Sequence, residues 1–292
     1  MNERITVRVP ATSANLGSGF DSLGLALALT EDIEITLGPE GATPHPLTQL
    51  VATAVGSAFR EVGRSRPKEL SIVAKGRSHI PIARGLGASA AGRAAGLLAA
   101  NALMGGPLSP EELLTLGAQL EGHADNMAPS LFGGLEIVVR DHDRWQCLAV
   151  PLPRDLKVVL FVPDFEMPTR ESRLRLPKRL ARDDAVFNIG RAALLVAALA
   201  QGRWELLDVA TQDRIHQPGR GEIFTALGDI FAAAKDGGAH AAYLSGSGST
   251  VAALATSNAE RIARLMQQAA IARGYSGRST ITQPSDEGAR IV

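Results

Sequence analysis

A glycine-rich segment that runs directly into a predicted helix is the feature that most limits what this chain can fold into. The segment is Pro81–Ala91, with the letters PIARGLGASAA, and an alanine-rich pattern predicts a helix over Ser89–Met104. Glycine lets the backbone approach a ligand closely, and the N–H groups at a helix N-terminus attract phosphate oxygens. The stretch 70–110 contains no acidic residue, and its basic residues are Lys75, Arg77, Arg84 and Arg93. This local charge favours a loop that binds a polyphosphate.

Two nucleotide-binding motifs share this outline, and the letters distinguish them. A Walker A loop needs Lys-Ser or Lys-Thr after its glycines, and this segment has neither. The spacing Gly85-x-Gly87-x-x-Ala90 fits the looser dinucleotide fingerprint, but that fingerprint needs an acidic residue about 20 positions further on, and the stretch 70–110 does not supply one. A dinucleotide-dependent oxidoreductase is therefore disfavoured. The structural alternative is a helix start rich in glycine and alanine for close packing alone.

The length and the charge balance restrict the domain organisation and the partners. At 292 residues the chain is long enough for two domains, and the proline-rich stretch Pro151–Pro153 predicts a boundary that gives domains 1–153 and 154–292. The 30 Lys and Arg residues balance 30 Asp and Glu residues, so no overall field favours nucleic acid or an anionic membrane. We expect a small-molecule substrate, no nucleic acid and no membrane as partners. A homodimer is expected only from the general frequency of dimers.

Cysteine content and the first residues bear on the cellular compartment. Cys147 has no second cysteine to pair with, so an internal disulfide and a multi-cysteine metal cluster are both excluded. The first residues, MNER, lack the basic and then apolar run of a signal peptide. Every apolar stretch is interrupted before the roughly 18 residues that a membrane helix needs. We therefore expect a cytoplasmic protein.

Strand-like and helix-like patterns alternate along the chain and predict an α+β fold. Strands are predicted over Thr6–Val9, Asp32–Leu37, Leu70–Lys75, Lys157–Val162 and Ser279–Thr282, a hairpin over Leu135–Arg140 and Trp145–Val150, and two more strands within Ala241–Ala255. Helices are predicted over Leu47–Val62, Ser89–Met104, Pro110–Glu121, Asp184–Leu199, Glu222–Lys235 and Ala259–Arg273. The third helix has the strongest start signal, because Ser109, Pro110 and Glu112 form a capping box with proline at its first position.

An acidic segment follows this third helix. Glu121 falls in its last turn, where a carboxylate is unfavourable unless a cation offsets it or water solvates it. Mg²⁺ suits the first option, because it is held by one or two protein oxygens together with phosphates and water. Ser89, at the mouth of the glycine loop, could supply a hydroxyl. A solvated glutamate fits the spacing equally well.

Other polar residues have both a binding and a structural interpretation. His123 has no second histidine or cysteine at ligand spacing, so zinc is disfavoured. Asp125 and Asn126 could bind a substrate or cap the turn that follows. Asn15 and Asp21 lie in a glycine-rich interruption between two strands, where polar residues are expected to face a pocket. Arginine binds carboxylates through two parallel hydrogen bonds, so the arginines of the second half are candidates for binding a small acid. They are Arg173, Arg191, Arg214 and Arg220. Solvation at the surface also explains any one of them.

Taken together, these segments resemble the GHMP small-molecule kinases, and more closely the homoserine kinases. The resemblance rests on motifs that follow one another along nearly the whole chain. They are Val9–Gly17, Gly19–Gly24, Pro81–Ala91, Glu121–Pro129, Val162–Glu166, Arg173 with Leu176 and Pro177, Asp184–Asn188, His216–Arg220 and Leu244–Thr250.

The resemblance implies a function, a fold and a set of site residues. It implies ATP-dependent phosphorylation of the side-chain hydroxyl of L-homoserine. The implied fold has an N-terminal domain with a mixed β-sheet and helices that carry the phosphate loop, and a C-terminal ferredoxin-like α/β sandwich. The ATP phosphates would lie against Pro81, Ile82, Ala83, Arg84, Gly85, Leu86, Gly87, Ala88, Ser89, Ala90 and Ala91, with Mg²⁺ on Ser89 and Glu121. Homoserine would lie among Asn15, Asp21, His123, Asn126, Arg173, Arg220 and Gly246, with Arg173 and Arg220 on its carboxylate. The catalytic residues would be Glu121, Asp125 and Asn126, with Asp125 nominated as a base only by analogy, since the hydroxyl proton could also pass to the phosphate.

Several positions depart from the family pattern. The family usually has Ser at Ala88, Pro at Ser18, Ala-Gly-Pro over Ser247–Ser249, and Tyr at Gly219. Gly219 and Ser249 could loosen the loops around Arg220 and Gly246. The alternatives to a homoserine kinase are therefore a catalytically silent nucleotide-binding protein on the same fold, or a kinase for another small acceptor such as mevalonate.

Overall fold

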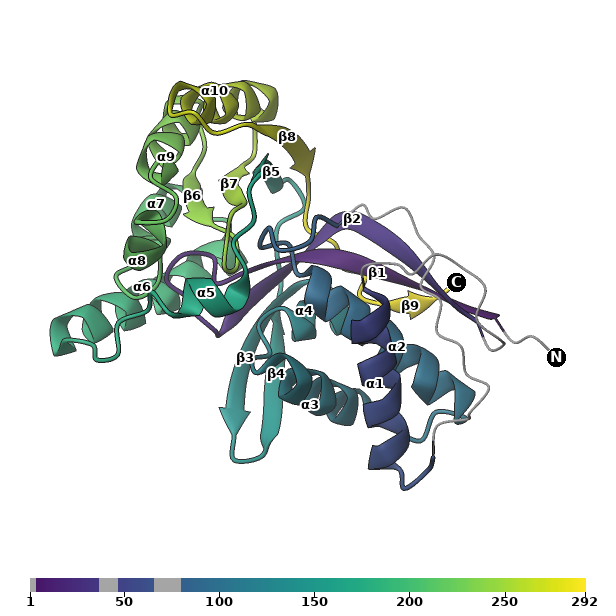
Figure 1. Ribbon diagram of the computed structural model, residues 1–292. Helices are drawn as coiled ribbons and strands as arrows, with labels where there is room; N and C mark the ends of the chain where they lie inside the picture. Colours follow the sequence, from purple (N-terminus) through teal and green to yellow (C-terminus); the bar gives the residue numbers. More distant parts are fainter. Residues whose placement is uncertain (1–3, 37–46, 66–79) are drawn as a thin grey trace.

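Two antiparallel sheets and the helices that cover them make up the described part of the chain. The computed structural model describes residues 4–36, 47–65 and 80–292. In Figure 1 the first sheet and its helices occupy the lower part of the view, and the second sheet lies above it. The predicted α+β class is confirmed. Among the described residues, no helix combines the length and the apolar character needed to cross a bilayer.

The first sheet has the order β4-β3-β2-β1-β9. Its strands are β1 (Arg4–Ala14), β2 (Leu23–Thr36), β3 (Leu135–Asp141), β4 (Arg144–Val150) and β9 (Arg290–Ile291). Every pairing between these strands is antiparallel, whereas the expectation was a mixed sheet. The predicted strand Leu70–Lys75 lies outside the described residues. The predicted hairpin is confirmed, and β1 and β2 extend further toward each other than predicted, leaving a short turn over 15–22.

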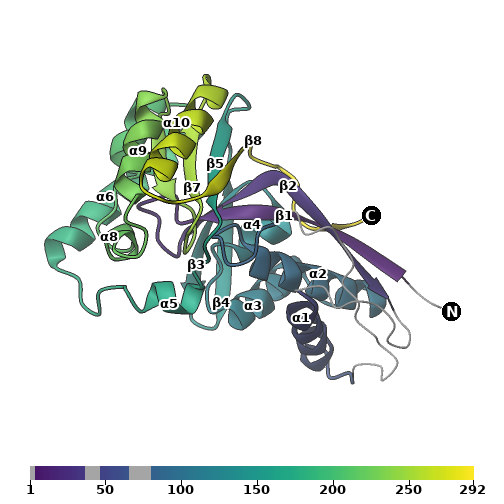
Figure 2. The same cartoon turned by 45° about the horizontal axis from the view of Figure 1, so that its top comes forward.

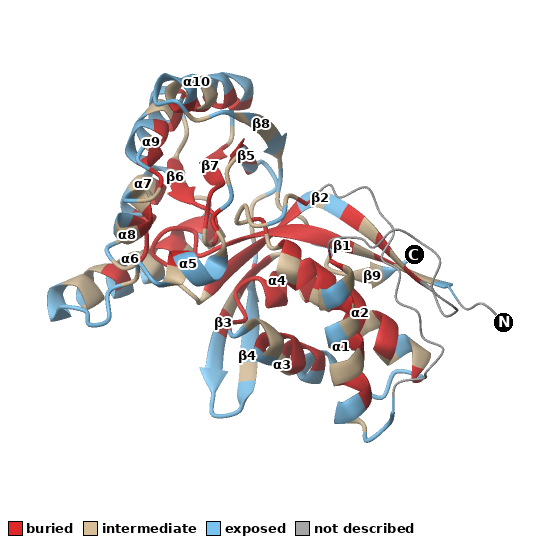
Figure 3. Cartoon of the chain, viewed as in Figure 1, coloured by how far each residue is buried: buried red, intermediate tan, exposed pale blue. Residues whose placement is uncertain are grey.

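Three helices pack against the first sheet, α2 (Ala88–Leu103), α3 (Pro110–Glu121) and α4 (Met127–Phe132). A fourth, α1 (Thr48–Glu61), packs on α2 and α3. The capping box is confirmed: Ser109 Oγ accepts a hydrogen bond from the N–H of Glu112, and the Glu112 carboxylate accepts one from the N–H of Ser109. Small residues on α2 allow close packing, because a Cβ on Gly96 would lie 2.5 Å from the carbonyl oxygen of Val51. Figure 3 shows buried residues running through this layer.

The second sheet has the order β6-β7-β5-β8 and the ferredoxin-like arrangement that was expected. Its strands are β5 (Lys157–Pro163), β6 (Ala241–Leu244), β7 (Val251–Ala255) and β8 (Gly277–Thr282). The helices α9 (Leu227–Asp236) and α10 (Ala259–Ala272) pack against each other and against this sheet, as Figure 2 shows. The helix α6 (Arg182–Gln201) contacts η1 (Trp204–Leu206) and α7 (Leu207–Ala210).

Short helices fill the connections of the second half. They are α5 (Thr169–Arg173), η1 (Trp204–Leu206), α7 (Leu207–Ala210) and α8 (Gln217–Gly221). The predicted helix over Glu222–Lys235 is wrong at its start, because residues 222–226 form turns and α9 begins only at Leu227. The turn buries Phe224 against the rings of Phe165 and Tyr275, at centroid distances of 5.1 and 4.8 Å. Tertiary packing of one aromatic side chain thus overrides local helix propensity.

The chain returns to the first sheet at its C-terminal end. β9 pairs with β1, and the N–H of Ser285 donates to the carbonyl oxygen of Ala26 on β2. The predicted boundary at Pro151–Pro153 falls between β4 and β5. We propose this boundary as the division between the two domains, with the residues of β9 packed on the first.

Candidate active site

A cavity of about 260 Å³ lies where the two halves of the chain meet. Its walls come from the β1–β2 turn, the glycine loop with the start of α2, the segment between α3 and α4, α5, α8 and the loop after β6. The lining residues are Asn15, Asp21, Leu47, Leu50, Pro81, Ile82, Ala83, Gly85, Leu86, Gly87, Ala88, Ser89, Glu121, His123, Asp125, Asn126, Pro168, Thr169, Arg173, Arg220, Gly246 and Ser247. Nearly all the residues singled out from the sequence are therefore brought to one cavity from distant parts of the chain.

The glycine loop ends in an uncapped helix start that borders this cavity. Gly87 is the N-cap of α2, has a φ of 68°, and provides no side-chain cap. A Cβ at Gly87 would lie 1.8 Å from Thr12 Oγ1, so only glycine allows the loop to pack against β1 in this conformation. The first N–H groups of a helix have no partner within the helix, and they attract anions. The loop can therefore bind phosphate oxygens mainly through its backbone.

Three residues predicted within this loop do not face the cavity. Ala90 and Ala91 lie in the first turn of α2 and are fully buried. The guanidinium of Arg84 donates from Nε to the carbonyl oxygen of Pro163 over 2.8 Å, and it also contacts the carbonyl oxygen of Asp164. The side chain of Arg84 therefore ties the loop to the end of β5.

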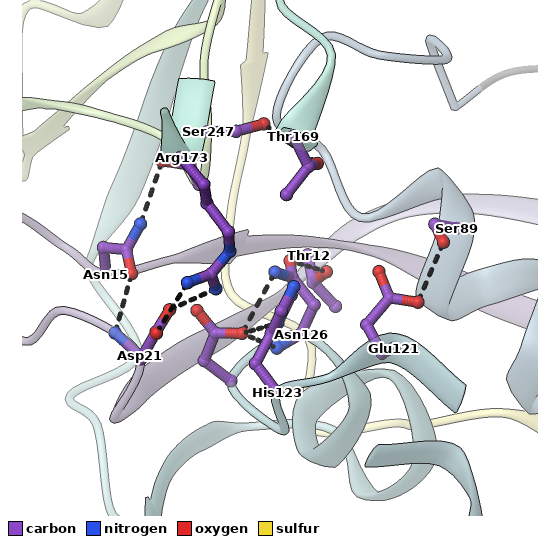
Figure 4. Close-up of polar contacts among 12 residues, drawn as sticks. Thr12, Asn15, Asp21, Ser89, Glu121, His123, Asn126, Thr169, Arg173 and Ser247 are labelled. Carbon is purple, nitrogen blue, oxygen red and sulfur yellow. Dashed lines mark hydrogen bonds and ion pairs between the residues drawn. The ribbon is translucent and has the colours of Figure 1, made fainter. Parts of the chain in front are cut away.

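Ser89 and Glu121 face each other across the entrance to this loop. Ser89 Oγ donates to Glu121 Oε2 over 2.8 Å, as drawn in Figure 4. Both contribute oxygen ligands of the kind that Mg²⁺ prefers. Arg93, one helical turn after Ser89, also contacts both side chains. Glu121 is therefore not solvated, and its carboxylate contacts both Ser89 and Arg93. The spacing of these residues in the sequence did not predict this arrangement.

A hydrogen-bond network joins the segment between α3 and α4 to β1. Asp125 Oδ1 lies 2.6 Å from His123 Nδ1 and accepts a hydrogen bond from the N–H of Asn126 over 2.9 Å. Thr12 Oγ1 donates to Asn126 Oδ1 over 2.7 Å. Figure 4 shows His123, Asn126 and Thr12 grouped between the Ser89–Glu121 pair and Arg173. Asp125 therefore has a structural role within this network as well as a place in the cavity wall.

Asp21 and Arg173 pair with each other on the other side of the cavity. The two guanidinium nitrogens of Arg173 lie 3.0 and 2.7 Å from the two carboxylate oxygens of Asp21. Asn15 positions this turn, because its Oδ1 accepts from the N–H of Asp21 and its Nδ2 donates to the carbonyl oxygen of Gly246. Most of the charge on Arg173 is therefore already balanced by Asp21.

Arg220 is the cation whose charge is not balanced in this way. It is 2% exposed, and among the described residues no carboxylate forms an ion pair with it. Its guanidinium donates to His216 Nδ1 over 2.8 Å and to the carbonyl oxygen of Gly246 over 2.9 Å, while its Nε has no partner in the described part of the chain. Burial and the nearby charge of Arg173 lower the pKa of Arg220 to about 10, so it remains a cation at neutral pH. The carboxylates of Asp21, Asp213 and Asp125 act on this charge only from a distance. A buried guanidinium on a cavity wall with no carboxylate in contact favours an anionic ligand.

The two other candidate arginines lie elsewhere. Arg191 and Arg214 both stack on the ring of Phe187, and Arg214 forms a salt bridge with Asp184 over 3.1 Å. Neither belongs to the cavity wall. The structural interpretation therefore holds for both of them.

Several residues of the site carry no assignment from the sequence. The hydroxyl oxygens of Thr169 and Ser247 lie 3.4 Å apart on the cavity wall. Thr169 lies in no motif, and Ser247 lies within the motif Leu244–Thr250 but was not assigned to the site. Leu47 and Leu50 reach the cavity from the start of α1 and were assigned only to a helix. His216 lies within a family motif, but its contact with Arg220 depends on the turn of a short helix that had no periodic signal.

Positions that depart from the family pattern are well packed. A Cβ on Gly219 would lie 2.3 Å from the carbonyl oxygen of Arg175, so this glycine permits a close approach rather than a loose loop. Ser249 is fully buried and donates to the carbonyl oxygen of Phe165 over 2.7 Å. Ser18 is also buried, and it donates to the carbonyl oxygen of Ala210 over 2.7 Å. The expectation of looser loops around Arg220 and Gly246 is therefore wrong.

Comparison with known proteins agrees with this architecture. The model of the GHMP kinases N terminal domain matches residues 49–134, and that of the GHMP kinases C terminal domain matches residues 195–272. Homoserine kinase of Moorella thermoacetica is 39% identical over an alignment of 297 residues that covers 98% of this chain and 99% of the relative. Homoserine kinase of Deinococcus radiodurans is 42% identical over 257 residues, which cover 84% of this chain and 82% of the relative.

A solved structure extends the likeness to three dimensions. The crystal structure of homoserine kinase from Cytophaga hutchinsonii superposes with a TM-score of 0.87 at 29% sequence identity, and the match covers 100% of this chain and 98% of that one. The cavity at the junction of the two halves and the matches along nearly the full length lead to one conclusion. The chain belongs to the GHMP kinases and, within them, to the homoserine kinase family.

Proposed function

We propose that this protein transfers the γ-phosphoryl group of ATP to the side-chain hydroxyl of L-homoserine and forms O-phospho-L-homoserine, a step toward threonine. The observation that carries the choice of acceptor is Arg220, a buried cation on the cavity wall that lacks a carboxylate partner among the described residues. The carboxylate of an amino acid would supply the missing charge. The Asp21 carboxylate, which faces the same space, would receive the ammonium group of the substrate.

The glycine loop is the proposed site of the nucleotide. Within Pro81–Ala91, the backbone of the residues that line the cavity, up to Ser89 at the start of α2, would hold the phosphates of ATP. Ser89 and Glu121 would hold Mg²⁺, since they offer two hard oxygen ligands 2.8 Å apart beside that helix start. The ion would neutralise phosphate charge, which is the main demand of phosphoryl transfer.

The reaction then needs the acceptor hydroxyl in line with the γ-phosphorus. The hydroxyl oxygen bonds to phosphorus, the bond to the β–γ bridging oxygen breaks, and ADP leaves. Asp125 is the carboxylate we nominate to take the hydroxyl proton, and its orientation is set by His123 and by the N–H of Asn126. Direct transfer of that proton to the phosphate is the alternative, and an Asp125→Asn variant that keeps most of its turnover would favour it.

The deciding experiment measures ADP release by purified protein with Mg-ATP. L-homoserine is compared with mevalonate, L-serine and no acceptor. We expect turnover with homoserine alone. Turnover with mevalonate alone would reject the proposed acceptor and keep the kinase, whereas ATP binding without ADP release would favour the silent nucleotide-binding alternative.

The tight packing around the departures from the family pattern supports an active enzyme. Ser249, Ser18 and Gly219 each fit their surroundings, and none of them places a side chain in the cavity wall. Ala88 removes one hydroxyl from the loop, but the backbone donors of α2 and the hydroxyl of Ser89 remain. We propose a cytoplasmic enzyme that acts on small molecules.

A further inference from the structure

A guanidinium lies at the place where the proposed metal ion would bind. Arg93 is on α2, four residues after Ser89, so the two side chains project from the same face of the helix. Its Nη1 contacts both Ser89 Oγ and Glu121 Oε2. The same carboxylate oxygen of Glu121 also accepts the hydrogen bond from Ser89. One carboxylate, one hydroxyl and one fixed cation therefore form a compact triad beside the glycine loop.

The triad is shielded from water, which makes its charges interdependent. The side chain of Arg93 is 15% exposed and that of Glu121 is 10% exposed. Burial lowers the pKa of the Arg93 guanidinium, and its Nε has no hydrogen-bond partner among the described residues. Arg93 thus depends on Glu121 for compensation of its charge, because a buried ion without a partner is strongly destabilising.

A divalent ion at the same oxygens would change this balance. It would share Glu121 with a second cation a few ångströms away, and like charges at such a distance repel, more strongly in a partly buried site than in water. The repulsion ends if Arg93 turns away, and anionic phosphates bound beside the start of α2 would offer it another partner.

We propose that Arg93 is the resident counter-ion of Glu121 and competes with the divalent ion for that carboxylate, so that metal binds weakly until nucleotide phosphates are present. This inference rests on the proposed metal site at Ser89 and Glu121. It gives Arg93 a positioning role, in which it keeps the metal-binding carboxylate oriented and charge-balanced when the nucleotide is absent.

The test measures metal binding directly, without nucleotide and without turnover. Mn²⁺ is titrated into the purified full-length protein, and free Mn²⁺ is followed by electron paramagnetic resonance. Arg93→Met, which keeps the length of the side chain and removes its charge, should bind Mn²⁺ about tenfold more tightly than the wild type. Arg93→Lys keeps the charge and should stay near the wild-type affinity. Glu121→Gln should abolish this binding in both the wild-type and the Arg93→Met background.

A matched control separates the local effect from a change in net charge. Arg8 pairs with Asp32 through two hydrogen bonds of 2.7 Å, outside the cavity. Arg8→Met removes the same charge and should leave Mn²⁺ affinity unchanged. An equal gain in Arg8→Met would overturn the local competition.

The outcome that rejects the inference is unchanged or weaker Mn²⁺ binding by a folded Arg93→Met protein. If that variant does not fold, Arg93→Gln provides the same comparison, with circular dichroism as the check of folding. The ADP-release assay with homoserine is independent of this result. Turnover with unchanged metal affinity in the Arg93 variants rejects the competition and keeps the enzyme, whereas tighter metal binding without homoserine-dependent turnover rejects the proposed function alone.

Discussion

Arg220 donates to Nδ1 of His216 over 2.8 Å, and Nε2 of the same ring lies 2.7 Å from the carbonyl oxygen of Gly17. The two contacts require one tautomer, in which Nε2 carries the proton and Nδ1 accepts. Full burial lowers the pKa of His216 to about 4, so the ring is neutral and its lone pair is available to the guanidinium. The ring of Phe20 stacks on the imidazole of His216 at a centroid distance of 5.3 Å. A neutral histidine thus orients the cation that faces the cavity.

Arg220→Ala should raise the KM for homoserine by about 10- to 100-fold, because a charge-assisted hydrogen bond to the substrate carboxylate is lost. The KM for ATP should stay within about twofold, since the proposed contacts with the nucleotide are made by the glycine loop and not by the side chain of Arg220. Steady-state kinetics with each substrate varied in turn measure both constants. A change confined to the ATP constant would show that the assignment of Arg220 is wrong.

His216→Ala should raise the KM for homoserine by about tenfold while kcat changes little, because the orientation of Arg220 is lost and the reacting groups are untouched. His216→Gln restores an acceptor and should recover part of the loss. The same kinetic assay separates the two constants. Equal damage from Ala and Gln, with the loss in kcat alone, would argue against a positioning role.

The neutral state of His216 also predicts how stability depends on pH. Its pKa is lower in the folded chain than its ordinary value of 6.5, so the unfolded chain takes up a proton first as the pH falls. This contribution to stability is complete above about pH 6.5 and is lost progressively toward pH 4. Urea unfolding across this range should show that the free energy of unfolding falls by roughly 1 to 3 kcal/mol in the wild type. The fall should be smaller in His216→Gln. His142→Gln is the matched control, because the side chain of His142 is 93% exposed. If His142→Gln reduced the pH dependence of the unfolding free energy as much as His216→Gln, burial of His216 would not be its cause.

The buried carboxyl group of Glu136 should make stability depend on pH in the opposite direction. Its carboxyl group is buried on β3, Oε2 has no partner among the described residues, and burial raises its pKa to about 7. Folding therefore favours the protonated form, and stability is lost as the pH rises from about 4.5 through 7. Glu136→Gln should be more stable than the wild type by roughly 1 to 2 kcal/mol at pH 8 and equal to it near pH 4 in urea unfolding. Glu222→Gln, at an exposed position, is the control, and its stability relative to the wild type should not depend on pH. If Glu136→Gln differed from the wild type by the same free energy of unfolding at all pH values, the prediction would be contradicted.

Gly219→Ala tests the close approach between α8 and the segment after α5. The added Cβ would lie 2.3 Å from the carbonyl oxygen of Arg175, so we expect a loss of roughly 1 to 3 kcal/mol in unfolding free energy. The KM for homoserine should rise as well, because Arg220 is the next residue. Gly190→Ala on α6 is the control, since a Cβ there meets nothing within 4 Å, and it should stabilise the helix by about 0.5 to 1 kcal/mol. An unchanged free energy of unfolding in Gly219→Ala would mean that the backbone of this loop shifts to accommodate the added methyl group.

Local signals account for the parts of the fold that were predicted correctly. The capping box at Ser109, the hairpin around the turn at His142 and the glycines before α2 each act within a few residues, so their letters suffice. The turn over 222–226 was predicted as helix, because the packing partners of Phe224 lie 59 residues before it and 51 residues after it along the chain. The helix α4 was missed because its six residues are too few to show a period.

The sequence alone determined which residues are available for chemistry: a phosphate-binding loop, an acidic segment and a set of arginines, recognisable by residue type and order. Only the tertiary structure decided how their charges are paired. Asp21 neutralises Arg173, Glu121 is shared by Ser89 and Arg93, and Arg220 is left to a neutral histidine. The physical reason is that the state of a charge depends on what lies within a few ångströms of it, and such neighbours can come from distant segments, as Asp21 and Arg173 do at a separation of 152 residues.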